Sequence, residues 1–272
     1  MVAARCRFAN ALTVTTQFGL APSVSVLAPA KLTVFLRVTG VRDDGYHIID
    51  AEMVTLSLHD TLTMSEVTGE GPLLTASGPY SRGVPLDERN LISRSLRLAN
   101  RRARVHVDKQ IPQGGGLGGG SADAAAVLRW AGYTDLERAA TIGADVAFCL
   151  VGGRARVRGI GEIVEPLPVL DRVFTLIIPP LAVSTPAVYA AWDALGAPTA
   201  EGANDLEPAA IVVEPRLAYW RDEIGSTTGH TPTLAGSGAT WFVEGEHDNA
   251  LAAVSNEGAK VVVVTTTPSS EP

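Results

Sequence analysis

Apolar side chains recur along this chain with two different periods. Residues 23–40 and 48–67 carry them at roughly every second position, which is typical of half-buried β-strands. Pro29 interrupts the first of these segments, so we expect two strand pieces with a bend between them. Residues 90–102 carry them instead with the spacing of a helix. The pattern therefore predicts a fold that mixes strands and helices.

The same mixture continues to the end of the chain. Further strands are predicted at residues 103–112, 174–180 and 259–267, and further helices at residues 121–132, 134–143, 184–195 and 204–210. Residues 144–162 and 231–245 are each predicted as strands around a glycine turn, whereas residues 68–89 are predicted as loop. Because helices and strands do not alternate strictly, we expect an α+β fold and not a doubly wound sheet.

Composition and charge narrow the class of protein. Of the 272 residues, 46% are hydrophobic and 19% are charged, as in a compact soluble protein. The net charge of −7 provides no broad positive field for nucleic acid or an anionic membrane, and no apolar run is long enough to span a membrane. Only two cysteines are present, Cys6 and Cys149, so we expect no disulfide framework and a reducing, cytoplasmic location. Residues 1–22 lack the apolar core of a secretory signal and are predicted to be a flexible leader, with an organelle transit peptide as the alternative.

Between a predicted strand and a predicted helix lies the sequence KQIPQGGGLGGGSADAAAVL, residues 109–128. Six of the seven residues from Gly114 to Gly120 are glycine. Glycine lets the backbone turn freely and lets a ligand approach the bare amide groups. The helix that follows, with Ser121 as its predicted N-cap and Gly132 at its end, adds unpaired N–H groups and a partial positive charge. This arrangement is typical of a phosphate-binding loop.

Other glycine-rich sequences fit the loop less well. A Walker A motif ends in Gly-Lys-Ser or Gly-Lys-Thr, but no lysine directly precedes Ser121. The dinucleotide fingerprint G-x-G-x-x-G is met at Gly114, Gly116 and Gly119, but a run so rich in glycine meets it almost automatically. Asp135 has roughly the spacing of a ribose-binding acid but lies in a predicted helix. A dinucleotide oxidoreductase is therefore a remote alternative, and a flexible linker does not usually join a clean strand to a capped helix.

Five segments together resemble the GHMP small-molecule kinases. Pro112-x-x-x-Gly-Leu-Gly-Gly-Gly-Ser resembles the phosphate loop of that family. The other segments lie in the family's order: APAKLTVFLRVTGVRDDGYH at residues 28–47, GADVAF at 143–148, NDLE at 204–207 and LAGSGAT at 234–240. Lys31 and Leu36, combined with Asp-Gly-Tyr-His at residues 44–47, resemble the branch of the family that acts on a cytidine-diphosphate-linked methylerythritol. The resemblance covers about residues 24–264.

The resemblance implies a fold and an activity. It implies two lobes, residues 23–167 with the phosphate loop and residues 168–272, with the active site in the cleft between them. The implied reaction transfers phosphate from ATP, with Mg²⁺, to the 2-hydroxyl of 4-diphosphocytidyl-2-C-methyl-D-erythritol in the non-mevalonate (MEP) pathway of isoprenoid biosynthesis. We therefore expect a small-molecule substrate, no nucleic acid or membrane partner, and either a monomer or a homodimer.

The resemblance also assigns the catalytic residues. Asp145 aligns with the family's base, which removes the proton of the attacking hydroxyl. On local sequence alone, an acid at this element boundary is explained equally well as a helix N-cap. Lys31 is implied to be the partner of Asp145, keeping the carboxylate ionised and polarising the substrate hydroxyl. Without the resemblance, a solvated lysine at a strand edge stays open as the alternative for Lys31.

The remaining site residues follow from the same match. ATP-binding residues are implied at Pro112, Gly114, Gly115, Gly116, Leu117, Gly118, Gly119, Gly120, Ser121 and Asn90, and Ser121 is also implied to contact the magnesium ion. Substrate-binding residues are implied at Thr33, Tyr46, His47 and Tyr189, of which the aromatic ones would bind cytosine. Structural alternatives stay open: Asn90 and Ser121 also suit helix N-caps, and Tyr189 also suits core packing.

Several positions depart from the family's pattern or carry a structural prediction. Thr33 stands where the family usually has asparagine, so contact with the erythritol hydroxyls is expected to change. The segments before and after the glycine loop are shorter than the family's, so we expect trimmed helices. The second glycine loop, residues 236–238, is expected to pack beside the first, and Asn204 with Asp205 to form a structural cap.

Two other functions stay open on the sequence alone. One is another GHMP kinase, of the homoserine or mevalonate type, which would not require a cytidine group or the Asp-Gly-Tyr-His segment at residues 44–47. The other is a catalytically inactive nucleotide-binding homologue, against which the presence of both Lys31 and Asp145 argues.

Overall fold

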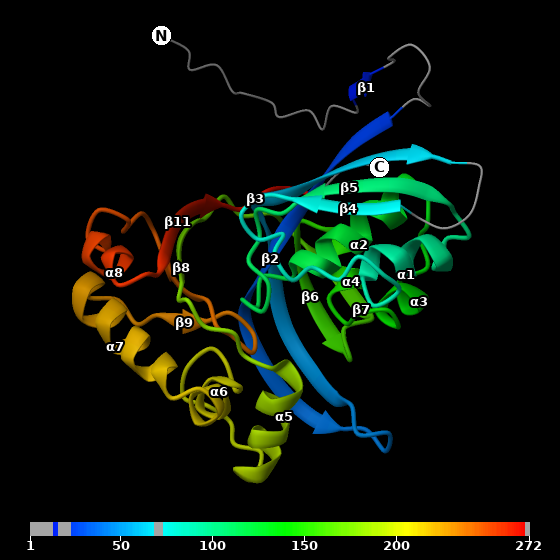
Figure 1. Cartoon of the computed structure of the whole chain (residues 1–272). Coiled ribbons are helices and arrows are strands. Elements are labelled where there is room, and N and C mark those ends of the chain that lie inside the picture. The colour runs from blue at the N-terminus through cyan, green and yellow to red at the C-terminus, as the bar shows by residue number, and fades with distance from the viewer. Residues whose placement is uncertain (1–12, 16–22, 68–72, 270–272) are drawn as a thin grey trace.

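The protein is described by a computed structural model that covers residues 13–15, 23–67 and 73–269 (Figure 1). Apart from strand β1 (Thr13–Thr15), which pairs with the start of β2, the leader predicted at residues 1–22 lies outside the described residues. No helix in the described ranges has both the length and the apolar character needed to cross a bilayer. The described strands form two sheets, and helices cover them.

The larger sheet is built on one long antiparallel hairpin, β2 (Ser23–Val41) and β3 (His47–Glu66), whose turn contains Gly45 at a φ of 85°. The first half of β3 pairs with β6 (Arg154–Gly159), and the second half pairs with β5 (Ala103–Asp108). Strand β4 (Leu73–Ser77) extends the sheet beyond β5, and β7 (Ile163–Leu167) extends it beyond β6. The hairpin therefore holds the two ends of the sheet together.

Strand β2 is continuous, although a bend was expected at Pro29. The structure accommodates the proline by a register shift between Pro29 and Lys31, since a proline has no N–H to give to the ladder. Beyond the shift, Lys31 lies opposite Thr55 of β3, and its N–H donates to the carbonyl of Leu117 in the glycine loop at 3.0 Å. The irregularity in the strand thus ties it to the glycine loop.

Four helices pack together against the larger sheet (Figure 1). They are α1 (Leu91–Leu98), α2 (Gly119–Trp130), α3 (Leu136–Ala140) and α4 (Val146–Val151). Helix α2 lies at the centre, against α1, α4 and β2. Its consecutive Ala124, Ala125 and Ala126 are fully buried, which lets the backbone of α2 approach its neighbours closely.

Three predictions in this region were wrong or incomplete. Residues 146–151 form a helix and not a strand, because a short run that is apolar throughout has no period to separate the two. Helix α2 begins at Gly119, two residues before the predicted N-cap Ser121, and the residue before it, Gly118, is left-handed at a φ of 67°. Strand β4 lies in the segment predicted as loop.

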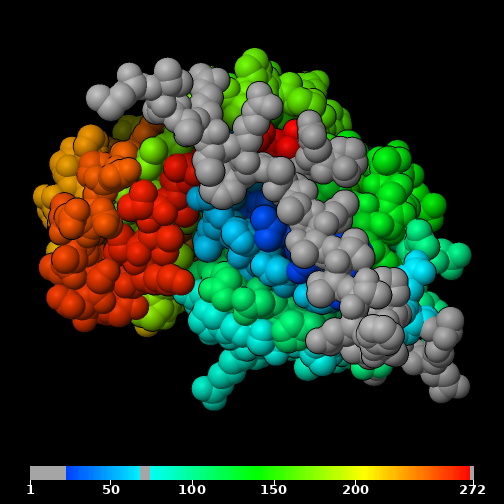
Figure 2. Space-filling view, turned by 90° about the horizontal axis from the view of Figure 1, so that it is seen from above, coloured from blue at the N-terminus to red at the C-terminus, as the bar shows by residue number. Residues whose placement is uncertain are grey.

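The smaller sheet comes from the C-terminal part of the chain and has the order β11–β8–β10–β9 in the described residues. Its strands are β8 (Val173–Ile178), β9 (Thr233–Leu234), β10 (Trp241–Glu244) and β11 (Lys260–Thr265). The same part of the chain contains four helices: α5 (Thr185–Ala194), α6 (Glu207–Val213), α7 (Arg216–Thr228) and α8 (Ala252–Asn256). Helices α7 and α8 were not predicted. Figure 2 shows the orange and red C-terminal elements on one side of the molecule and the cyan and green elements on the other.

The buried carboxylate of Asp205 ties the C-terminal part to β2. It accepts hydrogen bonds at 3.0 Å from the Arg37 guanidinium and the Val38 N–H, and at 2.9 Å from the Ala200 N–H. Backbone bonds beside it join Leu36 to both Ala203 and Asp205. Asp205 therefore has a structural role, but not the cap that was predicted, because α6 has Leu206 at its N-cap position and no side-chain capping bond.

Removing this carboxylate should destabilise the fold. In Asp205→Ala, two partly buried backbone N–H groups and Arg37 lose their acceptor, so we expect the free energy of unfolding to fall by about 2–4 kcal/mol. Urea denaturation measures this, with Asp222→Ala on the exposed surface of α7 as the control, for which we expect less than about 0.5 kcal/mol. A loss in Asp205→Ala as small as the control's would contradict this role.

Candidate active site

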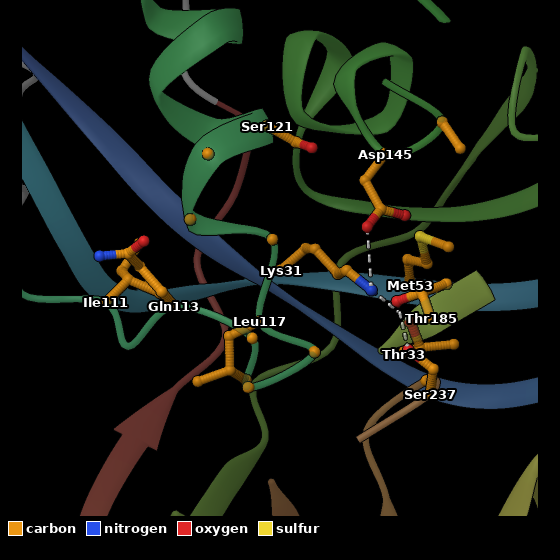
Figure 3. Close-up of a pocket in the computed structure, with 18 of the residues that line it drawn as sticks. Lys31, Thr33, Met53, Ile111, Gln113, Leu117, Ser121, Asp145, Thr185 and Ser237 are labelled. Carbon is orange, nitrogen blue, oxygen red and sulfur yellow. Dashed lines mark hydrogen bonds and ion pairs between the residues drawn. The ribbon is translucent and has the colours of Figure 1, made fainter. Parts of the chain in front are cut away.

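A cavity of about 440 Å³ lies where β2, the glycine loop and the C-terminal elements meet (Figure 3). Its wall includes Lys31 and Thr33 of β2, residues 111–121 of the glycine loop, Asp145 before α4, Tyr189 of α5, and Gly236 with Ser237 of the second glycine loop. The cavity therefore joins segments from nearly the whole length of the chain.

The glycine loop is confined on two sides, and its composition follows from that. Gly116 and Gly118 have φ angles of 76° and 67°, a region that favours glycine. A Cβ on Gly116 would lie 2.1 Å from the carbonyl oxygen of Ala235, and a Cβ on Gly118 would lie 2.7 Å from Cγ of Lys31. No side chain fits at either position, so the backbone amides of the loop stay open to a ligand.

The second glycine loop, residues 236–238, packs beside the first, as predicted. The N–H groups of Ala239 and Thr240 donate to the carbonyls of Gly114 and Gly115 at 3.3 and 3.2 Å. Buried Asn204 supports this arrangement, since its Nδ2 donates to the carbonyls of Leu234 and Gly236 at 2.9 and 2.7 Å. The shape of the phosphate-binding loop thus depends on residues more than 80 positions away in the sequence.

Lys31 and Asp145 form an ion pair inside the cavity, with 3.3 Å between Nζ and Oδ2 (Figure 3). The Lys31 side chain is 6% exposed and also donates to Oγ1 of Thr33 at 3.0 Å. Asp145 occupies the N-cap position of α4, but its side chain makes no capping bond. The sequence left open whether Asp145 is a helix N-cap or a functional acid. It lies at the helix boundary, but its carboxylate is turned toward Lys31 and is 31% exposed.

The first turn of α2 faces the same space. The N–H of Ala122 bonds to the carbonyl of Gly118, whereas the preceding helical N–H groups, at Gly119, Gly120 and Ser121, precede the first intrahelical bond. Such N–H groups and the positive end of the helix dipole attract an anion. In Figure 3 the hydroxyl of Ser121 points from this turn toward the side of the cavity that holds Asp145.

Comparison with known proteins agrees with this geometry. The family model for the GHMP kinases N terminal domain matches residues 90–153. A kinase of Paracoccus denitrificans named 4-diphosphocytidyl-2-C-methyl-D-erythritol kinase is 40% identical over 235 residues, which are 79% of this chain and 84% of that protein. One of Paramagnetospirillum magneticum with the same name is 35% identical over 87% of this chain and 94% of its own length.

This chain belongs to the 4-diphosphocytidyl-2-C-methyl-D-erythritol kinase family. The crystal structure of a 4-(cytidine 5'-diphospho)-2C-methyl-D-erythritol kinase is 31% identical and superposes with a TM-score of 0.70 over 89% of this chain and 98% of that one. A homoserine kinase from Cytophaga hutchinsonii has a TM-score of 0.64 at 18% identity, a likeness that shows the fold alone. The predicted resemblance and the α+β GHMP kinase fold are confirmed.

In this member of the kinase family, the structure brings most of the predicted site residues to one cavity. Lys31, Thr33, His47, Asp145, Tyr189, Pro112 and residues 114–121 all line it. Tyr46 and Asn90 do not line it: the Tyr46 side chain is 60% exposed in the hairpin turn, and Asn90 caps α1. Oδ1 of Asn90 accepts from the Ile92 N–H at 2.9 Å, and its Nδ2 donates to the Pro85 carbonyl at 2.7 Å. The ligand contacts of Tyr46 and Asn90 stay predictions.

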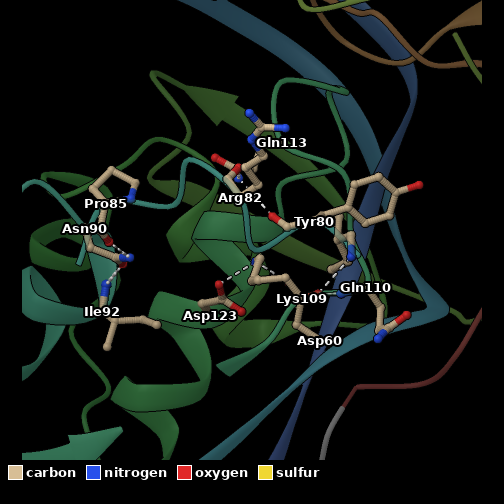
Figure 4. A network of polar contacts seen from close by, with 11 residues as sticks. Asp60, Tyr80, Arg82, Pro85, Asn90, Ile92, Lys109, Gln110, Gln113 and Asp123 are labelled. Carbon is tan, nitrogen blue, oxygen red and sulfur yellow. Dashed lines mark hydrogen bonds and ion pairs between the residues drawn. The ribbon is translucent and has the colours of Figure 1, made fainter. Parts of the chain in front are cut away.

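A buried charged cluster supports the glycine loop of this kinase, and sequence reasoning missed it (Figure 4). Nζ of Lys109 contacts Oδ2 of Asp60 and lies 2.6 Å from Oδ2 of Asp123. Oδ1 of Asp60 accepts from the N–H groups of Gln110 and Ile111. The cluster joins β3, the end of β5 and α2 on both flanks of the loop. An aspartate within a run of alanines was the signal that could have revealed it.

The two carboxylates of this cluster differ in their surroundings. Asp60 accepts two backbone N–H groups, whereas Oδ1 of Asp123 is buried without a hydrogen-bond partner in the described part of the chain. Burial therefore raises the pKa of Asp123 to about 7, even though Lys109 opposes this. Burial by itself would lower the pKa of Lys109, but the two carboxylates outweigh it and raise that pKa.

The cluster should make the stability of the kinase depend on pH. The pKa of Asp123 rises from 3.8 to about 7 on folding. Its contribution to the free energy of unfolding is therefore full below pH 3.8 and is lost as the pH rises through 7. The amide of Asp123→Asn resembles the protonated acid and does not titrate. As the pH rises from about 5 to 8, we therefore expect the free energy of unfolding of the variant to increase by about 1–3 kcal/mol relative to that of the parent.

Urea denaturation of both proteins across this pH range tests the prediction. Asp171→Asn, which changes an exposed acid, is the control and should follow the parent at every pH. Parallel stability profiles for Asp123→Asn and the parent would show that Asp123 does not titrate in this range in the folded protein.

Proposed function

We propose that this protein transfers the γ-phosphate of ATP to the 2-hydroxyl of 4-diphosphocytidyl-2-C-methyl-D-erythritol in the MEP pathway. The observation that carries the proposal is the Lys31–Asp145 pair, 3.3 Å apart, in the same cavity as the glycine loop. Family membership supports the reaction type and the phosphate donor. We further propose that the protein acts in the cytoplasm, as a monomer or homodimer, on this small molecule.

Backbone amides are proposed to hold most of the ATP phosphate charge. Among the described residues that line the cavity, the only lysines are Lys31 and Lys109, and no arginine is present. Lys31 is paired with Asp145, and Lys109 is shared by Asp60 and Asp123. The N–H groups of the glycine loop and the start of α2 are then the main partners of the phosphates.

The site suits a magnesium ion that is held mainly by its nucleotide. The described residues contain no cluster of three histidine, cysteine, aspartate or glutamate side chains that could hold a metal by themselves. Mg²⁺ in kinases keeps several waters and takes one or two protein oxygens besides the phosphates. The Ser121 hydroxyl, directed toward the side of Asp145, is the oxygen we assign to it (Figure 3). When bound, the ion would neutralise phosphate charge in the transition state.

Asp145 is proposed to act as the base. As the 2-hydroxyl oxygen attacks the γ-phosphorus in line, its proton passes to the carboxylate of Asp145, and ADP leaves. Lys31 orients that carboxylate and brings a positive charge to the attacking oxygen. Thr33, where the family usually has asparagine, accepts a hydrogen bond from Lys31, so its role is to place the lysine. No phosphorylated side chain is needed as an intermediate.

Loss of the carboxylate charge should abolish turnover. In Asp145→Asn the amide keeps the shape but cannot take the proton, so we expect kcat to fall by about 10²–10⁴-fold. ADP release from ATP and Mg²⁺ is measured with 4-diphosphocytidyl-2-C-methyl-D-erythritol added or withheld, and with homoserine and mevalonate in its place. Asp222→Asn should keep full activity. The proposal is contradicted if the parent protein releases ADP equally well without this acceptor. It is also contradicted if Asp145→Asn keeps more than about a tenth of the parent's kcat.

Replacement of Ser121 should change the magnesium requirement. Without its hydroxyl the ion loses its protein oxygen, so we expect Ser121→Ala to need about tenfold more Mg²⁺ for half-maximal activity, with much of kcat restored at saturation. Activity and ATP binding are titrated with Mg²⁺, and Ser226→Ala at the end of α7 serves as the control. If Ser121→Ala has the same magnesium dependence as the parent, the Ser121 hydroxyl does not bind the ion.

A further inference from the structure

Three side chains from the last two turns of α5 contact the ring of His47. Tyr189, Trp192 and Asp193 are spaced as i, i+3 and i+4, so they share one face of the helix. The centroids of the His47 and Tyr189 rings are 4.5 Å apart, and those of His47 and Trp192 are 5.6 Å apart with the two rings nearly perpendicular. Oδ1 of Asp193 lies 2.9 Å from Nε2 of His47. The His47 side chain is only 11% exposed, so its orientation is closely defined.

Asp193 stands at a position that local energetics disfavour. It lies in the last turn of α5, where the negative end of the helix dipole repels a carboxylate. The His47 ring is the one hydrogen-bond partner of its side chain within the described residues. A residue that conflicts with its local setting is expected where function requires it. The contact with His47 is therefore the reason to have an acid there.

This contact decides which nitrogen of the His47 ring carries the proton. A carboxylate can only accept a hydrogen bond, so Nε2 must carry the hydrogen that it donates to Asp193. In the neutral ring, Nδ1 is then left as an acceptor. Within the described residues, Nδ1 has no hydrogen-bond partner, and His47 lines the cavity. The ring thus offers an acceptor to a ligand.

We propose that Asp193 is a positioning residue that selects cytosine over uracil by fixing this tautomer of His47. Cytosine carries an exocyclic amino group, a donor, where uracil carries a carbonyl, an acceptor. The Nδ1 acceptor pairs with the amino group, whereas the carbonyl of uracil would face it lone pair to lone pair and leave both groups unsatisfied. This inference rests on the proposed function, because it concerns the base of the proposed substrate.

The test compares kcat/KM for the cytidine-diphosphate and uridine-diphosphate forms of methylerythritol in the parent, Asp193→Asn and Asp222→Asn. An amide at position 193 can present either its oxygen or its NH₂ to Nε2, so the tautomer is no longer fixed. We expect the cytidine-to-uridine ratio to fall about tenfold or more in Asp193→Asn, mainly through KM for the cytidine substrate, with KM for ATP unchanged. Asp222→Asn should keep the parent's ratio.

A purely structural role gives a different result. If Asp193 only holds α5 in place, both substrates lose kcat/KM equally in Asp193→Asn and the ratio survives, which overturns the inference. Nitrogen NMR of the His47 ring is the second measurement: the parent should carry its proton on Nε2, and a proton on Nδ1 would also overturn it. A parent that phosphorylates neither substrate contradicts the proposed function itself, whereas an active parent whose ratio does not depend on Asp193 contradicts this inference alone.

Discussion

The glycine loop has no room for a side chain at Gly116 or Gly118, and the rest of the site is arranged around that constraint. Lys31 closes one side and the carbonyl of Ala235 closes the other. A glycine backbone offers its amide groups to a ligand, and these are what a phosphate requires. The same confinement places Lys31, and through it Asp145, directly beside the loop. The phosphate-binding loop and the acid–lysine pair are therefore one packing unit.

Charge in this site is paired before any ligand arrives. Lys31 faces Asp145, and Lys109 faces two acids, one of which has its pKa raised by burial. A cavity without a free lysine or arginine among its described residues attracts a nucleotide weakly by charge alone. Backbone N–H groups and the α2 dipole must then supply most of the protein's attraction for the phosphates. The second glycine loop and the Lys109 cluster hold the glycine loop in place. This support matters because no flexible lysine or arginine of the cavity could take over the phosphate contacts if the loop amides moved.

Much of the fold was readable from local patterns, because alternation and glycine positions act over a few residues. The long strands, the glycine loop and the α+β class were predicted in this way. The strand predicted at residues 146–151 was wrong, because a six-residue apolar run has no period that separates a strand from a helix. The N-cap predicted at Ser121 was wrong, because α2 begins two residues earlier, after Gly118. The charged cluster joins residues 60, 109 and 123, and the His47 ring meets α5 only in space. Asp123 in its run of alanines marks an unusual buried acid, but its partners, like those of His47, are set by tertiary packing and not by a local pattern.

If the acid–lysine pair beside the glycine loop acts as proposed, phosphate is transferred to the 2-hydroxyl of the methylerythritol unit. The carbon that bears this hydroxyl also bears the methyl branch and carries no hydrogen. Phosphorus NMR of the purified product, made from ATP and 4-diphosphocytidyl-2-C-methyl-D-erythritol, therefore tests the claim most directly. The account predicts one new phosphomonoester signal that is not split by a proton on the neighbouring carbon. A signal split by such protons, or ADP without a phosphorylated acceptor, would contradict it.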